Sequence, residues 1–400
     1  MASHDQAASG TILINAQSEI GGIAEHAHYQ AQELARRGFD VVMLCHAGHL
    51  GRPARPLYRR IEALHSGHSG TALGRLAGVL RITLNRYRLA WHALRLRPRF
   101  VLWDSASEYF APLWACPHIL LRRAGVIQLA NLHDPVRDRH FGPEWLHRLS
   151  LGLLYRVLDG GLVHGPVPPG ATLPSRLALR EAPLGYFEDL RDVAELFDVR
   201  ARHGIPATAP LVLSFGHVAD RKNLDLLIEA MVSLPQAHLL VAGSSNNSTE
   251  KQVAFYRDLA GRRGVADRVH FDEVFVPDAA IPSYFTAADV VALTYCGDFV
   301  SQSGVLQHAA AFSRPVLVSC GQGPLRRTME RFALGELVEP DSVPAISAGL
   351  ARLLEAPQDR AAAFAAYAAT ASWQANIDQL LALEADVRAR KGLSRAASPA

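Results

Sequence analysis

Short apolar runs alternate with longer amphipathic stretches in this chain, and the alternating series occurs twice. The first series begins at residues 11–15 and the second at residues 211–215, each an apolar run that predicts a buried strand. Strands that alternate with helices form parallel sheets with helices on both faces. The order therefore predicts an α/β protein with two parallel-sheet domains, whose ligands bind beyond the carboxyl ends of the strands.

The expected elements share either a short apolar run or a helical period of apolar residues. Strands are expected at 11–15, 41–45, 100–103, 126–130, 161–163, 211–215, 238–242, 269–272, 290–293 and 316–319. Helices are expected at 24–37, 72–96, 143–158, 224–234, 250–263, 343–354, 358–370 and 373–388. The stretch 165–210 is rich in Pro and Gly and predicts the domain boundary. We expect an N-terminal domain over 1–185, a C-terminal domain over 205–370, and a final helix and tail over 371–400.

The composition excludes several classes of protein. Of 400 residues, 49% are apolar and 20% are charged, which excludes the collagen, coiled-coil and disordered classes. The 41 basic and 38 acidic residues give a net charge of +3, which argues against a nucleic-acid partner. The four cysteines form no CxxC pair, and we find neither a signal peptide nor an apolar run of about 20 residues. We therefore expect a soluble cytoplasmic protein without a disulfide framework.

Several common catalytic motifs are absent. No GxxxxGK[ST] phosphate loop and no HExxH zinc motif occurs, and the GQG sequence at 321–323 lacks the third glycine of the dinucleotide fingerprint. Ser303 lacks the first glycine of a nucleophile elbow. His26 and His28 stand two residues apart and cannot share a helix face. The sequence therefore gives no sign of a P-loop, a serine hydrolase or a metal centre.

Two turns that follow expected strands are suited to an anion. Gly21 and Gly22 open the first long helix, where free N–H groups attract phosphate, although a plain tight turn is the simpler alternative. The second turn, 216–223, contains Arg221 and Lys222, and the chain has only three lysines. This pair could neutralise a pyrophosphate leaving group, or it could be a solvated charge pair at a helix start.

Residues 209–350 resemble the nucleotide-sugar-binding domain of retaining GT-B glycosyltransferases, specifically glycosyltransferase family four. The matching stretches are LVLSFGHVADRKNLDLLIEAM, HLLVAGSS, RVHFDEVFVPDAAIPSYFTAADVVAL, SQSGVLQHAAAFSRPVLVS and ALGELVEPDSVPAISAGLARLL. The N-terminal half is similar more weakly, through SEIGGIAEHAHYQAQELARRGFDVVML and ANLHDP. The resemblance implies a GT-B fold, in which two Rossmann-like domains face each other across a cleft and the last helix crosses back to the N-terminal domain.

The resemblance also implies roles for individual residues. Gly21 and Gly22 match the glycine loop near the donor diphosphate and the acceptor. His133 matches the active-site histidine that touches the donor sugar, although a lone loop histidine is more often structural. Arg221 and Lys222 match the basic turn that binds phosphate. The other donor-binding positions lie in loops after later strands: His217, Val274, Phe275, Ser301, Gln302, Ser303, Gly304, Val305 and His308.

Three positions depart from the family pattern. The family has two glutamates eight residues apart, and Val300 and His308 stand in their places. His217 replaces the arginine of the family's Gly-Arg signature. Asp298 is near enough in sequence to substitute for the first glutamate, and His308 could bond a ribose hydroxyl or simply be packed. These departures leave open a catalytically silent nucleotide-sugar-binding protein or assembly partner.

The region 51–99 is strongly basic, with eleven arginines and a single acid, Glu62. Within it an apolar stripe recurs at helical spacing: Leu73, Ala77, Leu80, Leu84, Tyr87, Trp91 and Leu94. One interpretation is a face that meets an anionic membrane or a lipid-diphosphate acceptor. The other, which we expect, is a helix that packs on the core and leaves its arginines in solvent.

The resemblance implies a retaining glycosyltransferase of the hexosyltransferase type. It would move a sugar from a UDP- or GDP-sugar to a hydroxyl of a glycan or lipid-linked glycan in surface polysaccharide synthesis, and the resemblance implies that it needs no cofactor or metal. We expect it in the cytoplasm; if the first interpretation of 51–99 holds, that region would make peripheral contact with the inner face of the membrane. A sugar-nucleotide epimerase would need acid and base carboxylates in the cleft, which the sequence does not identify.

Overall fold

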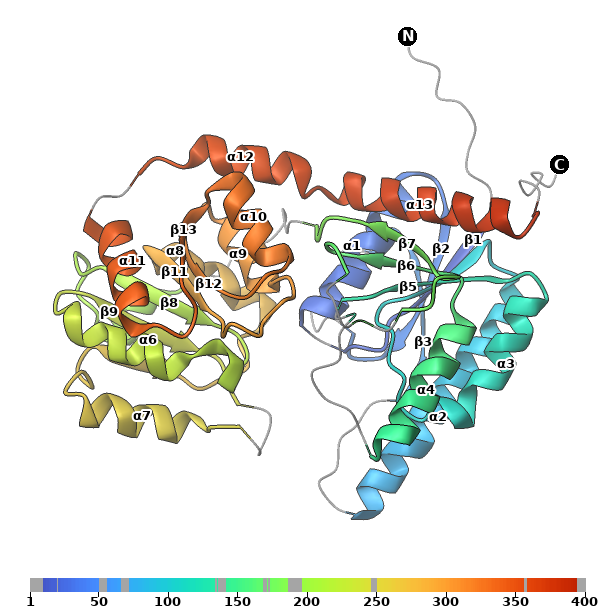
Figure 1. Cartoon of the computed structure of the whole chain (residues 1–400), viewed down its shortest axis with the longest axis horizontal. Helices are drawn as coiled ribbons and strands as arrows, with labels where there is room; N and C mark the ends of the chain where they lie inside the picture. The colour runs from blue at the N-terminus through green and yellow to red at the C-terminus, as the bar shows by residue number, and fades with distance from the viewer. Residues whose placement is uncertain are drawn as a thin grey trace, which may run out of the picture. The chain divides into compact units, whose positions relative to one another are not determined.

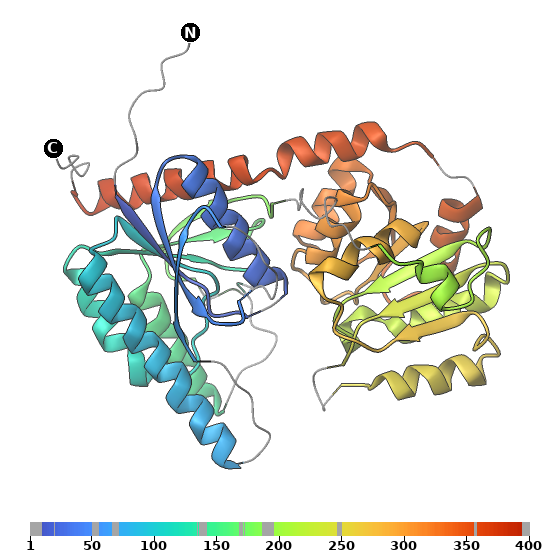
Figure 2. The same ribbon diagram turned by 180° about the vertical axis from the view of Figure 1, so that it is seen from behind.

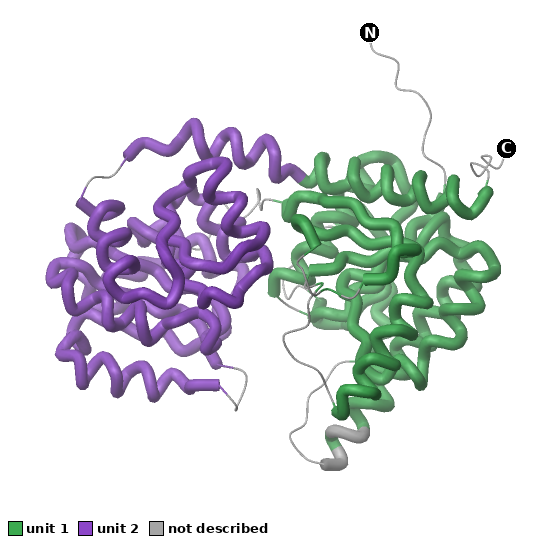
Figure 3. The backbone as a smooth tube through the Cα atoms, viewed as in Figure 1, with its two compact units in different colours: residues 1–185, 373–400 green, residues 186–372 purple. Residues whose placement is uncertain are grey.

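The computed structural model describes residues 10–19, 21–49, 56–65, 72–133, 135, 142–167, 171, 173–185, 196–245, 250–355 and 358–393. Strands and helices alternate through most of these residues (Figure 1). The chain divides into two compact units (Figure 3). The first unit comprises residues 1–185 and 373–400, and the second comprises residues 186–372.

The first unit is built on a seven-stranded parallel sheet. Its strands are β1 (Thr11–Asn15), β2 (Asp40–His46), β3 (Arg59–Leu64), β4 (Phe100–Trp103), β5 (Ile127–Asn131), β6 (Gly160–Val163) and β7 (Ala178–Glu181). They lie in the order β3-β2-β1-β4-β5-β6-β7, with each strand parallel to its neighbours. The inner strands are buried on both faces, which explains why their sequences are continuous apolar runs.

Two layers of helices cover this sheet. They are α1 (Gly22–Arg36), α2 (Ala72–Leu96), α3 (Ala111–Arg123), α4 (Glu144–Val157) and α13 (Trp373–Arg390). Helices α1 and α13 pack against one face, and α2, α3 and α4 cover the other, as the two opposite views show (Figures 1 and 2). Each layer encloses its own core, with Leu380 in the first and Trp114 in the second.

Helix α13 belongs to the first unit although it follows the whole second unit in sequence. Ile377, Leu380 and Leu383 recur at helical spacing and are fully buried beside the sheet. The buried carboxylate of Glu384 accepts a hydrogen bond from the Arg99 guanidinium, 2.9 Å away, next to β4. Apolar burial and this ion pair together attach the end of the chain to its beginning.

The second unit repeats the architecture with a six-stranded parallel sheet. Its strands are β8 (Leu211–Phe215), β9 (His238–Ala242), β10 (Val269–Asp272), β11 (Val290–Thr294), β12 (Val316–Ser319) and β13 (Gly335–Val338). Its helices are α5 (Val199–Arg202), α6 (Leu224–Ala230), α7 (Val253–Arg262), α8 (Ile281–Ala287), α9 (Gly304–Ala311), α10 (Pro324–Phe332), α11 (Val343–Glu355) and α12 (Ala361–Thr370). The strand order is β10-β9-β8-β11-β12-β13, so the order reverses between β8 and β11. Ligands of open α/β sheets bind at the carboxyl ends of the strands at such a point.

Helix α2 packs on the sheet through a different face from the one expected. The stripe residues Leu80, Leu84, Tyr87, Trp91 and Leu94 are 40–63% exposed, and Ala77 is also exposed. The prediction that this stripe packs on the core was therefore wrong; the side chain of Leu73 lies outside the described residues. Among the described helices, none is both long and apolar enough to cross a membrane.

The reason for the error is a buried arginine. The buried face of α2 consists of Asn85, Arg86, Leu89, Ala90 and Ala93. The guanidinium carbon of Arg86 lies 4.4 Å from the ring centroid of Trp103 and 5.0 Å from that of Trp114. The aromatic faces stabilise this cation in the interior, so a charged residue occupies a core position and the expected apolar stripe faces outward.

Candidate functional site

The basic turn after β8 and the start of α9 meet at one edge of the second sheet. Gly216 has a φ of +83°, which favours glycine. A Cβ atom placed on Gly216 would lie 3.7 Å from Nζ of Lys222 and 3.8 Å from Cγ2 of Val305. Because β8 and β11 are neighbouring parallel strands, the loops that follow them share this edge. The structure thus brings Lys222 and the segment that begins at Ser301 together.

The amine of Lys222 lies where burial disfavours its charged form. Its ammonium donates a hydrogen bond to the carbonyl oxygen of Phe215 at 2.8 Å. Burial, together with the charge of Arg221, lowers the pKa of Lys222 to about 7. The turn is tied to β11, since Thr294 Oγ1 donates to the carbonyl of Lys222 and the Cys296 amide donates to that of Arg221. An anion placed here would restore the charge of Lys222.

The loop before α9 is ordered by aromatic packing. The ring of Phe299 stacks on Tyr295 with centroids 3.8 Å apart, and the Arg221 guanidinium carbon lies 5.8 Å from the Phe299 ring. The Ser303 hydroxyl is 2.9 Å from the Tyr295 hydroxyl, so it is engaged away from the helix amides. The Ser303 amide is 3.0 Å from Oε1 of Gln302. This network fixes where Gly304 starts the helix.

The other expected donor-binding residues differ in exposure. Burial lowers the pKa of His217; the nearby Glu250 opposes this shift, and the charges of Lys222 and Arg221 add to it. Val274 and Phe275, in the loop after β10, are 40% and 50% exposed. His308 is instead buried in the core of the unit.

The ring of His308 lies 6.0 Å from that of Phe215 and 5.6 Å from that of Phe285. The ring therefore packs on two aromatic side chains, and its contact with a ribose hydroxyl stays a prediction. Val300 is half-buried and Asp298 is exposed. The position of the family's first glutamate therefore carries an apolar side chain with an acid two residues away.

In the first unit, Gly21 and Gly22 precede α1 with different backbone conformations. Gly21 has φ +84° and ψ −176°, a region open essentially to glycine alone. Gly22 has no such conformation, and a Cβ atom there would meet nothing within 4 Å. The Gly21 carbonyl accepts the amide of Glu25 at 3.1 Å and so begins the helix. Only Gly21 requires glycine for its backbone.

His133 lies beyond the carboxyl end of β5 and is paired with a second histidine. Nδ1 of His133 is 2.9 Å from Nε2 of His164, which directly follows β6. Nε2 of His133 is 3.0 Å from the Asp104 carbonyl oxygen, and Nδ1 of His164 is 3.1 Å from that of Ala182. These residues follow β4, β5, β6 and β7, which are neighbours in the sheet. His164 was not expected from the sequence, because no local motif links it to His133.

Two further buried groups adjoin this pair. His26 of α1 is fully buried, with its ring 4.9 Å from His133, 5.5 Å from His164 and 5.1 Å from Trp373. Burial lowers the pKa of His26 well below its usual value, and the other two histidines lower it further. Burial also raises the pKa of Asp104 to about 7. Across the described residues, no three His, Cys, Asp or Glu side chains are placed to hold a metal ion.

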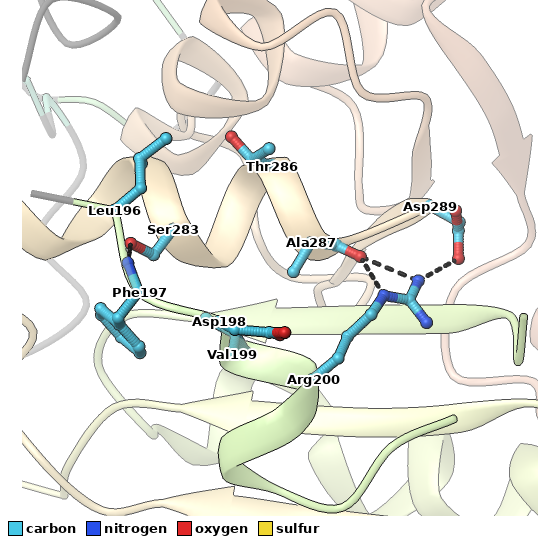
Figure 4. Close-up of a pocket in the computed structure, with 9 residues that line it drawn as sticks. All are labelled: Leu196, Phe197, Asp198, Val199, Arg200, Ser283, Thr286, Ala287 and Asp289. Carbon is cyan, nitrogen blue, oxygen red and sulfur yellow. Dashed lines mark hydrogen bonds and ion pairs between the residues drawn. The ribbon is translucent and has the colours of Figure 1, made fainter. Parts of the chain in front are cut away.

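A hollow of about 340 Å³ occurs at the opposite edge of the second sheet (Figure 4). Arg200 and Asp289 are among its lining residues. The Arg200 guanidinium donates to the carbonyl of Ala287 and to Oδ2 of Asp289, both at 2.9 Å. Asp289 in turn accepts the Leu211 amide at 2.8 Å. These polar groups hold α8 to the start of β8, so we assign the hollow's charged residues a structural role. Lys222 is not among the residues that line the hollow.

Comparisons with known proteins show the family of this chain. Residues 197–371 match the family model for glycosyl transferases group 1. A D-inositol 3-phosphate glycosyltransferase of Xylanimonas cellulosilytica is 32% identical over 409 residues, which cover 93% of this chain and 92% of that protein. The chain belongs to the group 1 glycosyltransferases. Other curated proteins of the same name match over shorter stretches, so that the chain spans 44% or less of their length.

Solved structures place this glycosyltransferase in the GT-B fold. Sucrose-phosphate synthase from Thermosynechococcus elongatus is similar with a TM-score of 0.72 and 20% identity, over 96% of this chain and all of that one. The Anabaena protein HepE, solved in complex with UDP and glucose, is similar with a TM-score of 0.67 and 18% identity, over 96% and 100% of the two chains. At these identities the likeness concerns the fold, and it confirms the predicted fold class.

Proposed function

We propose that this glycosyltransferase transfers a sugar from a UDP- or GDP-sugar to a hydroxyl of a glycan or glycolipid acceptor, with retention at the anomeric carbon and without a divalent metal. The observation that carries the proposal is the meeting of Lys222, Gly216 and Val305 at the reversal of strand order. An ammonium, a glycine that lets a ligand approach, and a helix start are the groups that a diphosphate requires.

In this proposal the basic turn stabilises the departing diphosphate. Negative charge grows on the β-phosphate as the glycosidic bond breaks, and Lys222 and Arg221 lie where they can balance it. The amino end of α9 adds its N–H groups and its positive dipole. Since the pKa of Lys222 is about 7 in the unliganded protein, the diphosphate would draw a proton onto the amine.

The nucleoside would bind along the same edge. The loop after β10 leaves Val274 and Phe275 exposed, so its backbone can reach the base and the Phe275 ring can stack on it. His217 lies near both the cations and Glu250, and it would contribute to the phosphate or ribose contacts. These contacts do not discriminate between uracil and guanine.

We propose that His133 positions the donor sugar and that Gly21 lets the ligand come close to the backbone. Both ring nitrogens of His133 already have partners in the protein, so its orientation is fixed before the donor arrives. We propose that the ring presents its edge to the sugar, while His164 holds it in place. Gly21 leaves the space in front of its backbone open, since a Cβ there would meet nothing within 4 Å.

A second candidate is a silent protein that binds nucleotide sugars without turnover. Two observations favour it: Val300 is apolar where the family has an acid, and His308 packs on Phe215 and Phe285. For the transferase, exposed Asp298 would have to orient the donor sugar in place of the missing acid.

We further propose that the acceptor is part of a surface polysaccharide or its lipid-linked precursor. The protein would then work in the cytoplasm, at the inner face of the membrane, with the Arg-rich region 51–99 close to the lipid. The excess of eleven arginines over one acid in this region supports such contact.

The test is release of free nucleoside diphosphate from a panel of UDP- and GDP-sugars, with and without acceptor and chelator. We expect one donor to be used, with no effect of the chelator, and Lys222→Ala to lower the rate by about 10²-fold or more. Lys391→Ala removes a lysine that pairs with Asp159 in the first unit and should leave the rate unchanged. Tight calorimetric binding of UDP or GDP with no turnover on any acceptor would favour the silent protein.

A further inference from the structure

An exposed apolar surface covers the outer side of α2, α3 and α4 in the first unit. Most of the large apolar side chains that stay exposed in the described part of the chain lie on these helices or just before α3. They are Leu80, Leu84, Tyr87, Trp91, Leu94, Tyr109, Leu113, Leu120, Trp145 and Leu149. We call this set the α2–α4 face. Exposed apolar groups that gather in this way mark an interaction surface.

The three helices that carry these side chains are neighbours. On α2 the apolar positions are spaced 4, 3, 4 and 3 residues apart, which aligns them in one stripe. The Tyr87 hydroxyl donates to the Leu113 carbonyl at 3.1 Å, so the stripe borders α3. Helix α3 packs in turn against α4, which carries Trp145 and Leu149 (Figure 1).

The charge around this face is mostly positive. Residues 72–133 contain nine arginines and two buried acids, Asp104 and Glu108. Helix α4 adds an exposed acid, Glu144, which is paired with Arg148 at 2.8 Å. Arg81, Arg88 and Arg95 stand seven residues apart and so form a row along one flank of the stripe. The Arg95 guanidinium carbon lies 4.6 Å from the Trp91 ring centroid, which places a cation beside the most amphipathic side chain of the stripe.

A recess opens within the same face. It has a volume of about 230 Å³. Its wall is largely apolar and includes Tyr109, Leu113 and Leu146, and it contains the buried Glu108 beside His147, with the carboxylate 3.5 Å from Nδ1. A recess of this kind gives an apolar chain segment somewhere to insert without a change in the helices.

Two partners could cover such a face: a second copy of this chain or a lipid surface. An apolar stripe with alternating spacings of 3 and 4 is also the pattern of paired helices. Two copies of α2, however, would bring their rows of Arg81, Arg88 and Arg95 together with no acid on either helix. Like charges would oppose that pairing, whereas an anionic lipid surface is complementary to both the arginines and the exposed tryptophans.

We propose that the α2–α4 face is a docking surface for an anionic bilayer. Trp91, Trp145 and the leucines enter the interfacial layer, and the arginine row meets the lipid phosphates. This deepens the proposed function by locating its membrane contact, and it extends that contact beyond 51–99 to α3 and α4. The binding itself does not depend on sugar transfer.

The experiment is co-sedimentation of the full chain with vesicles of phosphatidylcholine alone or mixed with phosphatidylglycerol. We expect binding to the anionic vesicles at low salt, weakening as salt increases, and little binding to the neutral ones. Arg81→Glu/Arg88→Glu/Arg95→Glu and, separately, Trp91→Ser/Leu94→Ser should each weaken binding at least tenfold. The matched controls, Arg257→Glu/Arg262→Glu/Arg263→Glu and Val232→Ser/Phe255→Ser in the second unit, should bind like the wild type.

Absence of binding to anionic vesicles at low salt would overturn the proposal, as would equal losses in the control variants. Self-association in sedimentation velocity that the Trp91→Ser/Leu94→Ser change abolishes would instead assign the face to a second copy. Circular dichroism checks that each variant is folded, which we expect because the changed side chains are exposed or half-buried. Vesicle binding without any nucleotide-sugar turnover would leave this inference standing and contradict only the proposed function.

Discussion

Nδ1 of His133 lies 2.9 Å from Nε2 of His164, and the outer nitrogen of each ring faces a backbone carbonyl oxygen. Three hydrogen bonds along this line need three N–H protons, because a carbonyl can only accept. Two neutral imidazoles supply two protons. One additional proton, shared by the pair, satisfies all three bonds. From these three contacts we predict that the pair binds one proton more than two neutral rings do.

His164→Ala should lower kcat/KM for sugar transfer about tenfold, because the loss of one hydrogen bond leaves His133 free to turn. The pH profile of kcat/KM should also change shape, since the shared proton no longer has two rings to bind. The control is His270→Ala, which breaks a second stacked histidine pair, His238 and His270, whose ring nitrogens are also 2.9 Å apart in the other unit. If both variants lose activity equally and keep the wild-type profile, His164 has no positioning role.

Lys222 gives a prediction for the pH dependence of donor binding. Its pKa is about 7, so most of the amine is uncharged at pH 8 and binding of a diphosphate must bring a proton with it. The affinity for UDP or GDP should be nearly constant below pH 7 and fall by up to about tenfold per unit above it. Calorimetry in buffers of different ionisation enthalpy should show proton uptake at pH 8 and little at pH 6. Lys222→Met should abolish the uptake, and uptake that persists would contradict the assignment.

All ten strands expected from the sequence occur in the structure. Each is an apolar run buried between helices, which makes it visible in the sequence. Strands β3, β7 and β13, which lie at the edges of their sheets, were missed. Edge strands are covered less completely, so their sequences, RRIEAL, ALRE and GELV, keep charged residues and lack a clear apolar run. Helices α3, α5 and α10 were missed as well; inside α3, Pro117 interrupts the usual helical signal.

The candidate site was predictable only in part. Lys222 and the segment from Ser301 follow neighbouring strands, so turn chemistry alone could place them at one edge. His164, Asp104 and His26 approach His133 from three other elements, and no local motif joins them. One feature of the sequence could have indicated them: His164 and Asp104 each directly follow an apolar strand, where ligand-binding residues of parallel sheets lie. On α2 the periodicity found the right stripe, but it could not show that Arg86 on the opposite face would be buried.

The two glycines before α1 should respond oppositely to alanine. Gly21→Ala places a side chain at φ +84° and ψ −176°, which should cost about 1–3 kcal/mol of unfolding free energy. Gly22→Ala adds a methyl group in open space at a helix start and should be neutral or stabilise the protein by up to about 1 kcal/mol. Urea unfolding of the two variants compares them directly. Equal effects would show that the Gly21 backbone is not constrained.

Because the pKa of Asp104 is raised in the folded protein, this residue should lower the unfolding free energy as the pH rises. Burial raises its pKa from 3.8 to about 7, against the pull of the Ser18 and Gln17 amides and of the Arg86 charge. Between these two values the folded protein keeps a proton that the unfolded chain has released. Stability therefore falls as the pH rises from about 4 to 7. A shift of about three units at about 1.4 kcal/mol each sets the full cost at about 4 kcal/mol, reached above pH 7.

Asp104→Asn keeps this position neutral at every pH, so it removes that cost. Its amide oxygen can still accept the Gln17 amide, which donates to Asp104 at 2.8 Å. From pH 4.5 to 8, the unfolding free energy of the variant relative to the wild type should rise by about 3 kcal/mol, because about 1 kcal/mol of the cost is already present at pH 4.5. Asp40→Asn is the control, because the Arg59 hydrogen bond lowers the pKa of Asp40 and its effect belongs below pH 4. A constant difference between the Asp104 variant and the wild type across this range would mean that Asp104 is already ionised at pH 4.5 in the folded protein.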